Sequence, residues 1–269
     1  MKNNLLTILL VLNTAICFSQ SLEEKFKRAK IYYSDSQQLS QLESLGVAVD
    51  HAKHKKGVFI ISDFSTSELS IARDNGYNIE ILIDDLEQHF LTQNNLKVPQ
   101  RNLACTDDSD TYQTPVHFND SAGSMGGYFT YQEVLDELDQ MKALYPNLIT
   151  TKSNISTFLT QGQPDNSVTP SIGDNGIKWV KISDNPDTSE QEPQILYSAI
   201  HHAREPMSLH QLIFYMWYLL ENYQTNPEIQ SIVNNTELFF VPVVNPDGYL
   251  YNEKTNPNGG GFWRKNRRN

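Results

Sequence analysis

The chain has 269 residues, with 21 Lys and Arg against 32 Asp and Glu, which gives a formal net charge of −11. This acidic balance excludes a generic nucleic-acid binder, which carries a basic surface field. Hydrophobic residues make up 39% of the chain, a share that excludes disorder throughout, and the length allows one large domain or two smaller ones.

The first 20 residues have the layout of a secretory signal peptide. One lysine precedes an apolar run from Leu5 to Ile16, and small residues follow at Cys17 and Ser19. This run is too short for a spanning helix, which needs about 20 apolar residues. We therefore expect a signal peptide at residues 1–19, a secreted or periplasmic protein, and no membrane span. Two alternatives remain open, a lipoprotein signal modified at Cys17 and a buried N-terminal helix.

Residues 20–94 predict a compact unit with the order β-α-β-β-α-β, which is the ferredoxin-like order. Leucines at helical spacing stop at Gly46, and a capping-box pattern at Ser65 and Glu68 opens the second helix. The predicted strands are residues 29–33, 47–52, 57–62 and 79–83, with a charged turn at 53–57 between the middle two. A helix-like polar segment follows at 84–94. The unit contains no cluster of catalytic side chains.

Residues 95–120 lack periodicity and are rich in polar residues, which predicts a linker. A second unit follows over residues 121–269. A capping box at Thr130 opens a helix that ends before Pro146. Strands are predicted at 178–182, 194–200 and 238–244, with a long helix from Met207 to about Tyr223 before the last strand. The second of these strands is almost continuously apolar, as expected for a strand covered on both faces.

The most informative residues follow this apolar strand. His201, His202, Arg204 and Glu205 lie within five positions, directly before a helix. Pro206 disfavours helical geometry at the preceding residue, so the His-x-x-Glu spacing belongs to a loop. The carboxyl ends of strands in α/β sheets are where ligands bind, and imidazole and carboxylate are suitable Zn²⁺ ligands. The motif alone is weak, and taken by itself it is more often a helix start capped by an acid, with adjacent histidines packed or exposed.

Two further segments extend the pattern. Asn245-Pro-Asp-Gly248 follows a strand, where it predicts an ordinary turn, and a basic tail with Arg264 next to Trp263 ends the sequence. In this order and spacing, the three segments resemble the zinc metallocarboxypeptidases, most closely the carboxypeptidase T type. The resemblance covers residues 127–269, and residues 27–90 resemble the pro-region of these enzymes.

The resemblance implies a fold and a site. It implies an α/β chain in which a ferredoxin-like α+β pro-domain precedes an incomplete α/β/α metallocarboxypeptidase domain with a mixed sheet. His202 and Glu205 match two ligands of a single Zn²⁺ ion, and Arg204 matches a substrate-binding arginine. Arg264 matches the catalytic arginine that polarises the scissile carbonyl, in an active-site strand-and-loop region facing a cleft. His201 is interpreted as structural.

The rest of the family's site has no match in this sequence. The third zinc ligand, the glutamate general base, the Asn-Arg pair for the substrate carboxylate and the closing tyrosine lie further along in the family, and 64 residues follow Glu205 here. A catalytic zinc takes three protein ligands and one open position. We therefore expect an incomplete copy of a longer protein that is inactive by itself.

Three hypotheses follow for the function. The first is a secreted zinc carboxypeptidase, made as a zymogen, that removes C-terminal residues from peptides or proteins. The second is a non-catalytic peptide-binding or inhibitory pseudo-carboxypeptidase, and the third is a related deacylase acting on another amide. An activating protease is expected to cut the linker near Arg101, because an exposed basic site there lies between two folded units.

Overall fold

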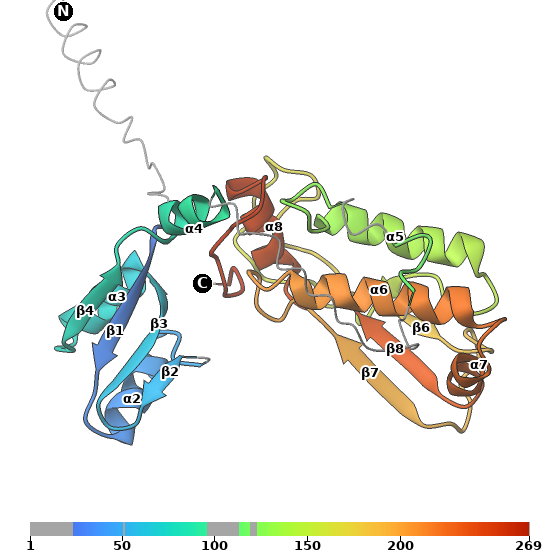
Figure 1. Cartoon of the computed structure of the whole chain (residues 1–269), viewed down its shortest axis with the longest axis horizontal. Helices are drawn as coiled ribbons and strands as arrows, with labels where there is room; N and C mark the ends of the chain where they lie inside the picture. The colour runs from blue at the N-terminus through green and yellow to red at the C-terminus, as the bar shows by residue number, and fades with distance from the viewer. Residues whose placement is uncertain (1–23, 51, 96–112, 119–122, 269) are drawn as a thin grey trace, which may run out of the picture. The chain divides into compact units, whose positions relative to one another are not determined.

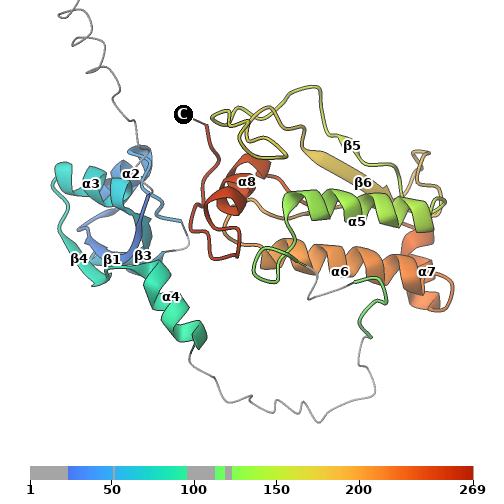
Figure 2. The ribbon, with the colours of Figure 1, turned by 90° about the horizontal axis from the view of Figure 1, so that it is seen from above.

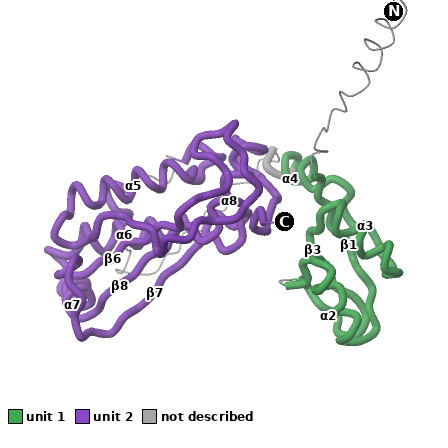
Figure 3. Tube along the Cα trace, turned by 180° about the vertical axis from the view of Figure 1, so that it is seen from behind, with its two compact units in different colours: residues 1–103 green, residues 104–269 purple. Residues whose placement is uncertain are grey.

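The computed structural model describes residues 24–50, 52–95, 113–118 and 123–268. The chain forms two compact units, residues 1–103 and 104–269 (Figure 3). The predicted signal peptide and most of the predicted linker lie outside the described residues. Within the described ranges, every helix is too short or too polar to cross a membrane.

The first unit is an antiparallel sheet with two helices between its strands and one after them. Its elements are β1 (Phe26–Tyr32), α2 (Ser36–Ser44), β2 (Lys53–Lys55), β3 (Phe59–Ser65), α3 (Thr66–Asp74), β4 (Ile79–Ile83) and α4 (Leu86–Asn95). The strands lie in the order β2-β3-β1-β4, with every pair antiparallel (Figure 1). The element order β-α-β-β-α-β is the one that the sequence predicted.

Polar capping and chain reversal explain the boundaries of this unit. Ser65 and Glu68 form the predicted capping box, in which Glu68 Oε2 accepts from the Ser65 amide at 2.9 Å. The prediction of a strand at 47–52 was wrong, because β2 lies where the charged turn was expected. Instead, the Val47 amide donates to Leu42 O at 3.1 Å and closes helix α2, while the Val47 side chain is buried in the core.

The second unit is a four-stranded mixed sheet with helices. Its elements are α5 (Tyr131–Leu144), β5 (Ser153–Asn154), β6 (Lys178–Ile182), β7 (Gln194–Ser198), α6 (Met207–Asn222), α7 (Pro227–Asn234), β8 (Glu237–Val241) and α8 (Pro246–Thr255). The strand order is β5-β6-β8-β7; β7 runs parallel to β8, while β6 is antiparallel to both β5 and β8. The mixed sheet agrees with the predicted fold class.

Helices α5 and α6 lie side by side along one face of this sheet (Figures 1 and 2). The apolar side chains of these two helices pack against every second side chain of the strands and form one core. Trp217 of α6 is fully buried in it. The other core residues at this contact are Val134, Leu138 and Met141 of α5, Val180 of β6, and Leu238 and Phe240 of β8. Because side chains alternate along a strand, Trp179 and Phe239 lie on the opposite face, where their rings stack at 5.7 Å.

Strand β7 is more exposed than its sequence predicted. The apolar run at 194–200 indicated a strand covered on both faces, yet β7 lies at the end of the strand order. Ile195 is 42% exposed and Leu196, which is opposite Phe239 on β8, is 66% exposed. Among the described residues, β8 is the strand that pairs with β7, so one edge of β7 faces solvent and side chains on both of its faces are exposed.

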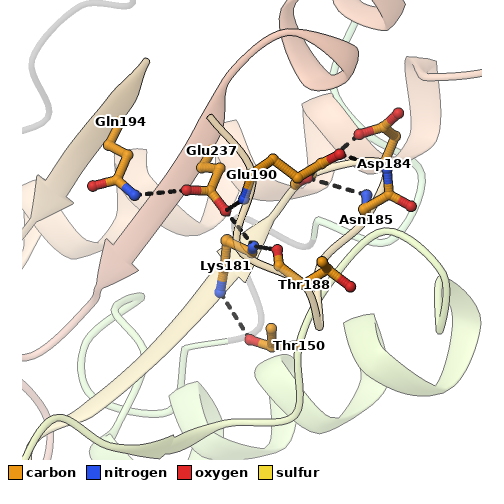
Figure 4. Close-up of polar contacts among 9 residues, drawn as sticks. Thr150, Lys181, Asp184, Asn185, Thr188, Glu190, Gln194 and Glu237 are labelled. Carbon is orange, nitrogen blue, oxygen red and sulfur yellow. Dashed lines mark hydrogen bonds and ion pairs between the residues drawn. The ribbon is translucent and has the colours of Figure 1, made fainter. Parts of the chain in front are cut away.

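A buried ion pair joins β6 to β8 on the opposite face from the helices (Figure 4). Lys181 Nζ lies 2.6 Å from Glu237 Oε1, and these side chains are 5% and 1% exposed. Glu237 also accepts from Gln194 Nε2 at 2.6 Å and from the Glu190 amide at 3.3 Å. The hydrogen bond from Lys181 is the main cause that lowers the pKa of Glu237, so the carboxylate stays charged inside the fold.

Candidate metal centre

The candidate site begins at the carboxyl end of β7. This strand ends at Ser198 and α6 begins at Met207, so the residues between them form a loop, as the position of Pro206 predicted. Ile200 has φ +49°, a conformation that β-branched residues rarely adopt. Its backbone is held on both sides, because Ile200 N donates to Ser208 Oγ at 3.3 Å and its carbonyl accepts from the Asn245 amide at 3.0 Å.

His202 and Glu205 point toward each other from this loop. His202 Nδ1 lies 3.1 Å from Glu205 Oε2, and the backbone carries a turn in which the Glu205 amide donates to His202 O. The His202 side chain is 26% exposed and that of Glu205 is 51% exposed. An imidazole nitrogen and a carboxylate oxygen are thus already adjacent and accessible to a small ion.

Arg264 completes this group from a distant segment. Its Nη2 lies 2.8 Å from His202 Nε2, and its Nε lies 3.9 Å from Glu205 Oε1. With this network we assign the neutral ring as donating from Nδ1 to Glu205 and accepting from Arg264 at Nε2. The Arg264 side chain is only 10% exposed, so its guanidinium is fixed beside the two candidate ligands.

The remaining predicted residues are placed nearby. Arg204 lies half-buried in the same loop, between Ala203 and Glu205. The His201 ring lies 3.3 Å from Ser198 Oγ at the end of β7. The segment around Arg264 was expected to include a strand, but residues 256–268 have no regular secondary structure. Side-chain and backbone contacts with α8 and the loop hold it in place instead.

Helix α8 supplies residues that sequence reasoning did not assign. Asn245-Pro-Asp-Gly248 is not an isolated turn: Asn245 is the N-cap of α8, and its Oδ1 accepts from Gly248 N at 3.1 Å. Asn before Pro at a helix start was the available signal. Asp247, which is 3% exposed, accepts hydrogen bonds from Thr160 Oγ1, the Gly162 and Gly173 amides and Asn175 Nδ2 at 2.8–3.0 Å. This carboxylate anchors the loop over residues 160–175.

The donor set at His202 and Glu205 fits part of a zinc site. A tetrahedral Zn²⁺ with bonds of about 2.0–2.2 Å separates neighbouring ligand atoms by about 3.3–3.6 Å, close to the observed separation. The described residues bring no third His, Cys, Asp or Glu ligand atom to this pair. Among the described residues, three potential ligands come together at Asp184, Glu190 and Glu192, beside the ion pair of Figure 4.

Comparisons with known proteins identify the family of the second unit. The zinc carboxypeptidase family model matches residues 135–269, half of the chain, and includes His202, Glu205 and Arg264. A zinc carboxypeptidase from Saccharothrix mutabilis subsp. capreolus is 34% identical over 143 residues, which are 52% of this chain and 29% of that protein. Carboxypeptidase A2 from Mus musculus is 29% identical over 144 residues, 54% of this chain and 29% of the relative.

A solved structure has a similar fold. The crystal structure of carboxypeptidase A from Helicoverpa armigera superposes with a TM-score of 0.56 at 17% identity, covering 91% of this chain and 53% of that chain. Because the family model matches half of the chain, the chain belongs to the zinc carboxypeptidase family, whose metal is zinc. It spans less than a third of the length of the curated relatives it matches.

Proposed function

We propose that the protein containing this chain is a secreted, zinc-dependent carboxypeptidase that hydrolyses the C-terminal peptide bond of peptides or proteins. The observation that carries the proposal is the gathering of His202, Glu205 and Arg264, which come from two segments far apart in the sequence, within 4 Å of one another. Two ligand types and one buried cation at the end of a sheet strand supply part of what hydrolytic zinc chemistry requires.

Each residue has a distinct role in this proposal. His202 and Glu205 would hold the zinc ion, which supplies Lewis acidity and lowers the pKa of bound water. Arg264 donates hydrogen bonds to the oxygen of the scissile carbonyl as negative charge develops on it. Because its guanidinium is already fixed, little reorganisation is needed at that moment. Arg204 binds the peptide backbone or carboxylate from the same loop.

The reaction needs more than these residues. A catalytic zinc takes three protein ligands, and a general base must accept a proton from the attacking water. The described residues offer two ligands, and we propose that the present chain is inactive by itself. The same observation motivates the second candidate, a peptide-binding or inhibitory pseudo-carboxypeptidase.

Zinc titration of the chain and of two histidine variants tests the ligand assignment. His202→Ala should abolish calorimetric zinc binding, whereas His201→Ala, which alters the neighbouring ring, should retain it. Equal binding by the His202→Ala variant and the parent would remove His202 from the site.

Carboxypeptidase activity is tested on the protein expressed from the complete reading frame. Release of C-terminal residues that a chelator abolishes is expected, and Arg264→Lys should lower kcat by a factor of about 10²–10³. A stop codon directly after Asn269 would favour the pseudo-carboxypeptidase instead.

We also propose that the protein is made as a zymogen, with a signal at residues 1–19, a pro-domain at 20–94 and cleavage in the linker near Arg101. The contacts of residues 113–118 with α6 support a cleavage site that precedes residue 113. Glu221 of α6 accepts from the amides of Val116 and His117 at 2.6 and 2.8 Å, and the His117 ring stacks on Trp217 at 4.9 Å. N-terminal sequencing of the mature protein should find a start within residues 95–112. A start after residue 118 would contradict this anchoring.

A further inference from the structure

One side chain of α8 contacts both segments of the candidate site. Asn252 is 3% exposed and lies in the last turns of the helix. Its Nδ2 donates to Ala203 O at 2.9 Å and to Trp263 O at 2.8 Å, and its Oδ1 accepts from the Trp263 amide at 3.0 Å. Both amide protons and the acceptor oxygen are therefore used, in a place where water does not compete.

These contacts lie next to the chemistry-bearing residues. Ala203 follows His202 and precedes Glu205 by two positions, and Trp263 directly precedes Arg264. The Ala203 amide also donates to Arg264 O at 3.0 Å, which places the two segments side by side. Asn252 thus bridges two peptide groups that lie 60 positions apart in the sequence and whose neighbours carry His202 and Arg264.

The packing of α8 requires the same close approach. A Cβ atom added at Gly248 would lie 2.8 Å from the Ala203 side chain and 2.6 Å from Lys265 O. Backbone atoms and a Cβ atom cannot move aside without displacing the chain. Helix α8 therefore approaches the loop and the Arg264 segment so closely that only glycine fits at position 248. The helix is therefore in direct contact with both segments at its start and through Asn252 near its end.

We propose that Asn252 is a positioning residue, which holds the His202–Glu205 loop and the Arg264 guanidinium at a fixed spacing. Its consequence for hydrolysis rests on the proposed function, whereas the clamp itself does not. Groups behind the ligands commonly change metal affinity or activity by about 10–100-fold, because they set the orientation of the ligands. Asn252 acts in this way through the backbone on either side.

Amide hydrogen exchange of the metal-free chain, resolved by NMR, tests the clamp. The readout is the Ala203 amide, which bonds to Arg264 and not to Asn252. In Asn252→Ala its exchange should accelerate by about tenfold or more, while amides of β6 and β8 change less, because the hydrogen bonds lost are local. Val233→Ala is the matched control, since it truncates a buried side chain of α7 that is 1% exposed. That variant should accelerate all slow amides of the unit together.

A uniform acceleration in Asn252→Ala, like that of the control, or an unchanged Ala203 amide would overturn the proposal. If Asn252→Ala does not fold, Gly261→Ala serves instead, because its Cβ would lie 2.6 Å from Asn252 Oδ1 and displace that side chain without removing a polar atom. The zinc dissociation constant of the same variants should rise by about tenfold or more. Faster Ala203 exchange in Asn252→Ala, together with a parent chain that binds no zinc, would support the clamp while removing the zinc-ligand assignment from the proposed function.

Discussion

Replacing Lys181 with methionine should lower the free energy of unfolding of the second unit by about 3 kcal/mol at pH 7. Removal of one partner from a buried ion pair costs about 3–5 kcal/mol, because the other charge is left uncompensated. The lower end applies here, since Glu237 keeps hydrogen bonds from Gln194 and the Glu190 amide. Lys152→Met, at the more exposed pair with Asp139, is the control and should cost about 0–1 kcal/mol.

The pH dependence of the free energy of unfolding provides a second, independent test of the buried ion pair. In the parent chain the pKa of Glu237 is lowered, so its contribution is complete above the carboxyl's unfolded pKa of about 4.3 and is lost as pH falls through the lower folded value. In Lys181→Met, burial without a cation raises that pKa instead, so protonation relieves the buried charge. The difference between parent and variant should therefore shrink from pH 7 to pH 5.

Urea denaturation followed by tryptophan fluorescence measures these changes. The three tryptophans, Trp179, Trp217 and Trp263, all belong to the second unit, so the signal reports that unit alone. The double variant Lys181→Met with Glu237→Leu removes both charges and should regain most of the loss. A loss below about 1 kcal/mol, or one that grows toward pH 5, would refute the reasoning about the buried pair.

Three further predictions concern other contacts. Asp247→Asn should destabilise the second unit by about 1–3 kcal/mol, because one oxygen and its charge no longer accept the loop's donors, and limited proteolysis should then cut within residues 160–175. Burial raises the pKa of Glu253 to about 7 in the folded chain, above the value of about 4.3 in the unfolded chain. The contribution of this group to stability therefore falls as pH rises from about 4.3 to about 7. Glu253→Gln should remove this part of the pH dependence of the urea midpoint. Ser65→Ala should lower the free energy of unfolding of the first unit by about 1 kcal/mol, because α3 loses its N-cap. Thermal unfolding followed by circular dichroism measures this change, and an unchanged melting curve would contradict the capping box.

Local signals predicted much of the fold. The bounds of β4 and β6 agree with the predicted strands, and the capping boxes at Ser65 and Thr130 open α3 and α5 as expected. These features depend on residues three or four positions apart, which a sequence displays directly. The placement of β2 was wrong because Val47 is buried without joining a strand, and an apolar alternation does not distinguish the two cases.

The candidate site was predictable in its residues more than in its support. His202, Glu205 and Arg264 were named from their spacing and the resemblance, and the structure brings them together. Asn252 was not found, because its partners are 49 and 11 positions away and a single asparagine on a helix resembles a solvated one. Its role depends on burial, which only the packing of the chain determines.

The open edge of β7 also affects how the chain behaves in solution. Within the part of the chain that the structure describes, this edge has no partner strand. Its backbone groups and the side chain of Leu196 offer a template on which another extended segment can add, which is how exposed edge strands nucleate aggregation. Lysine at an edge position opposes such addition at little cost when the side chain is already in water. Leu196→Lys should therefore keep this chain dispersed at concentrations at which the parent associates, as light scattering would show.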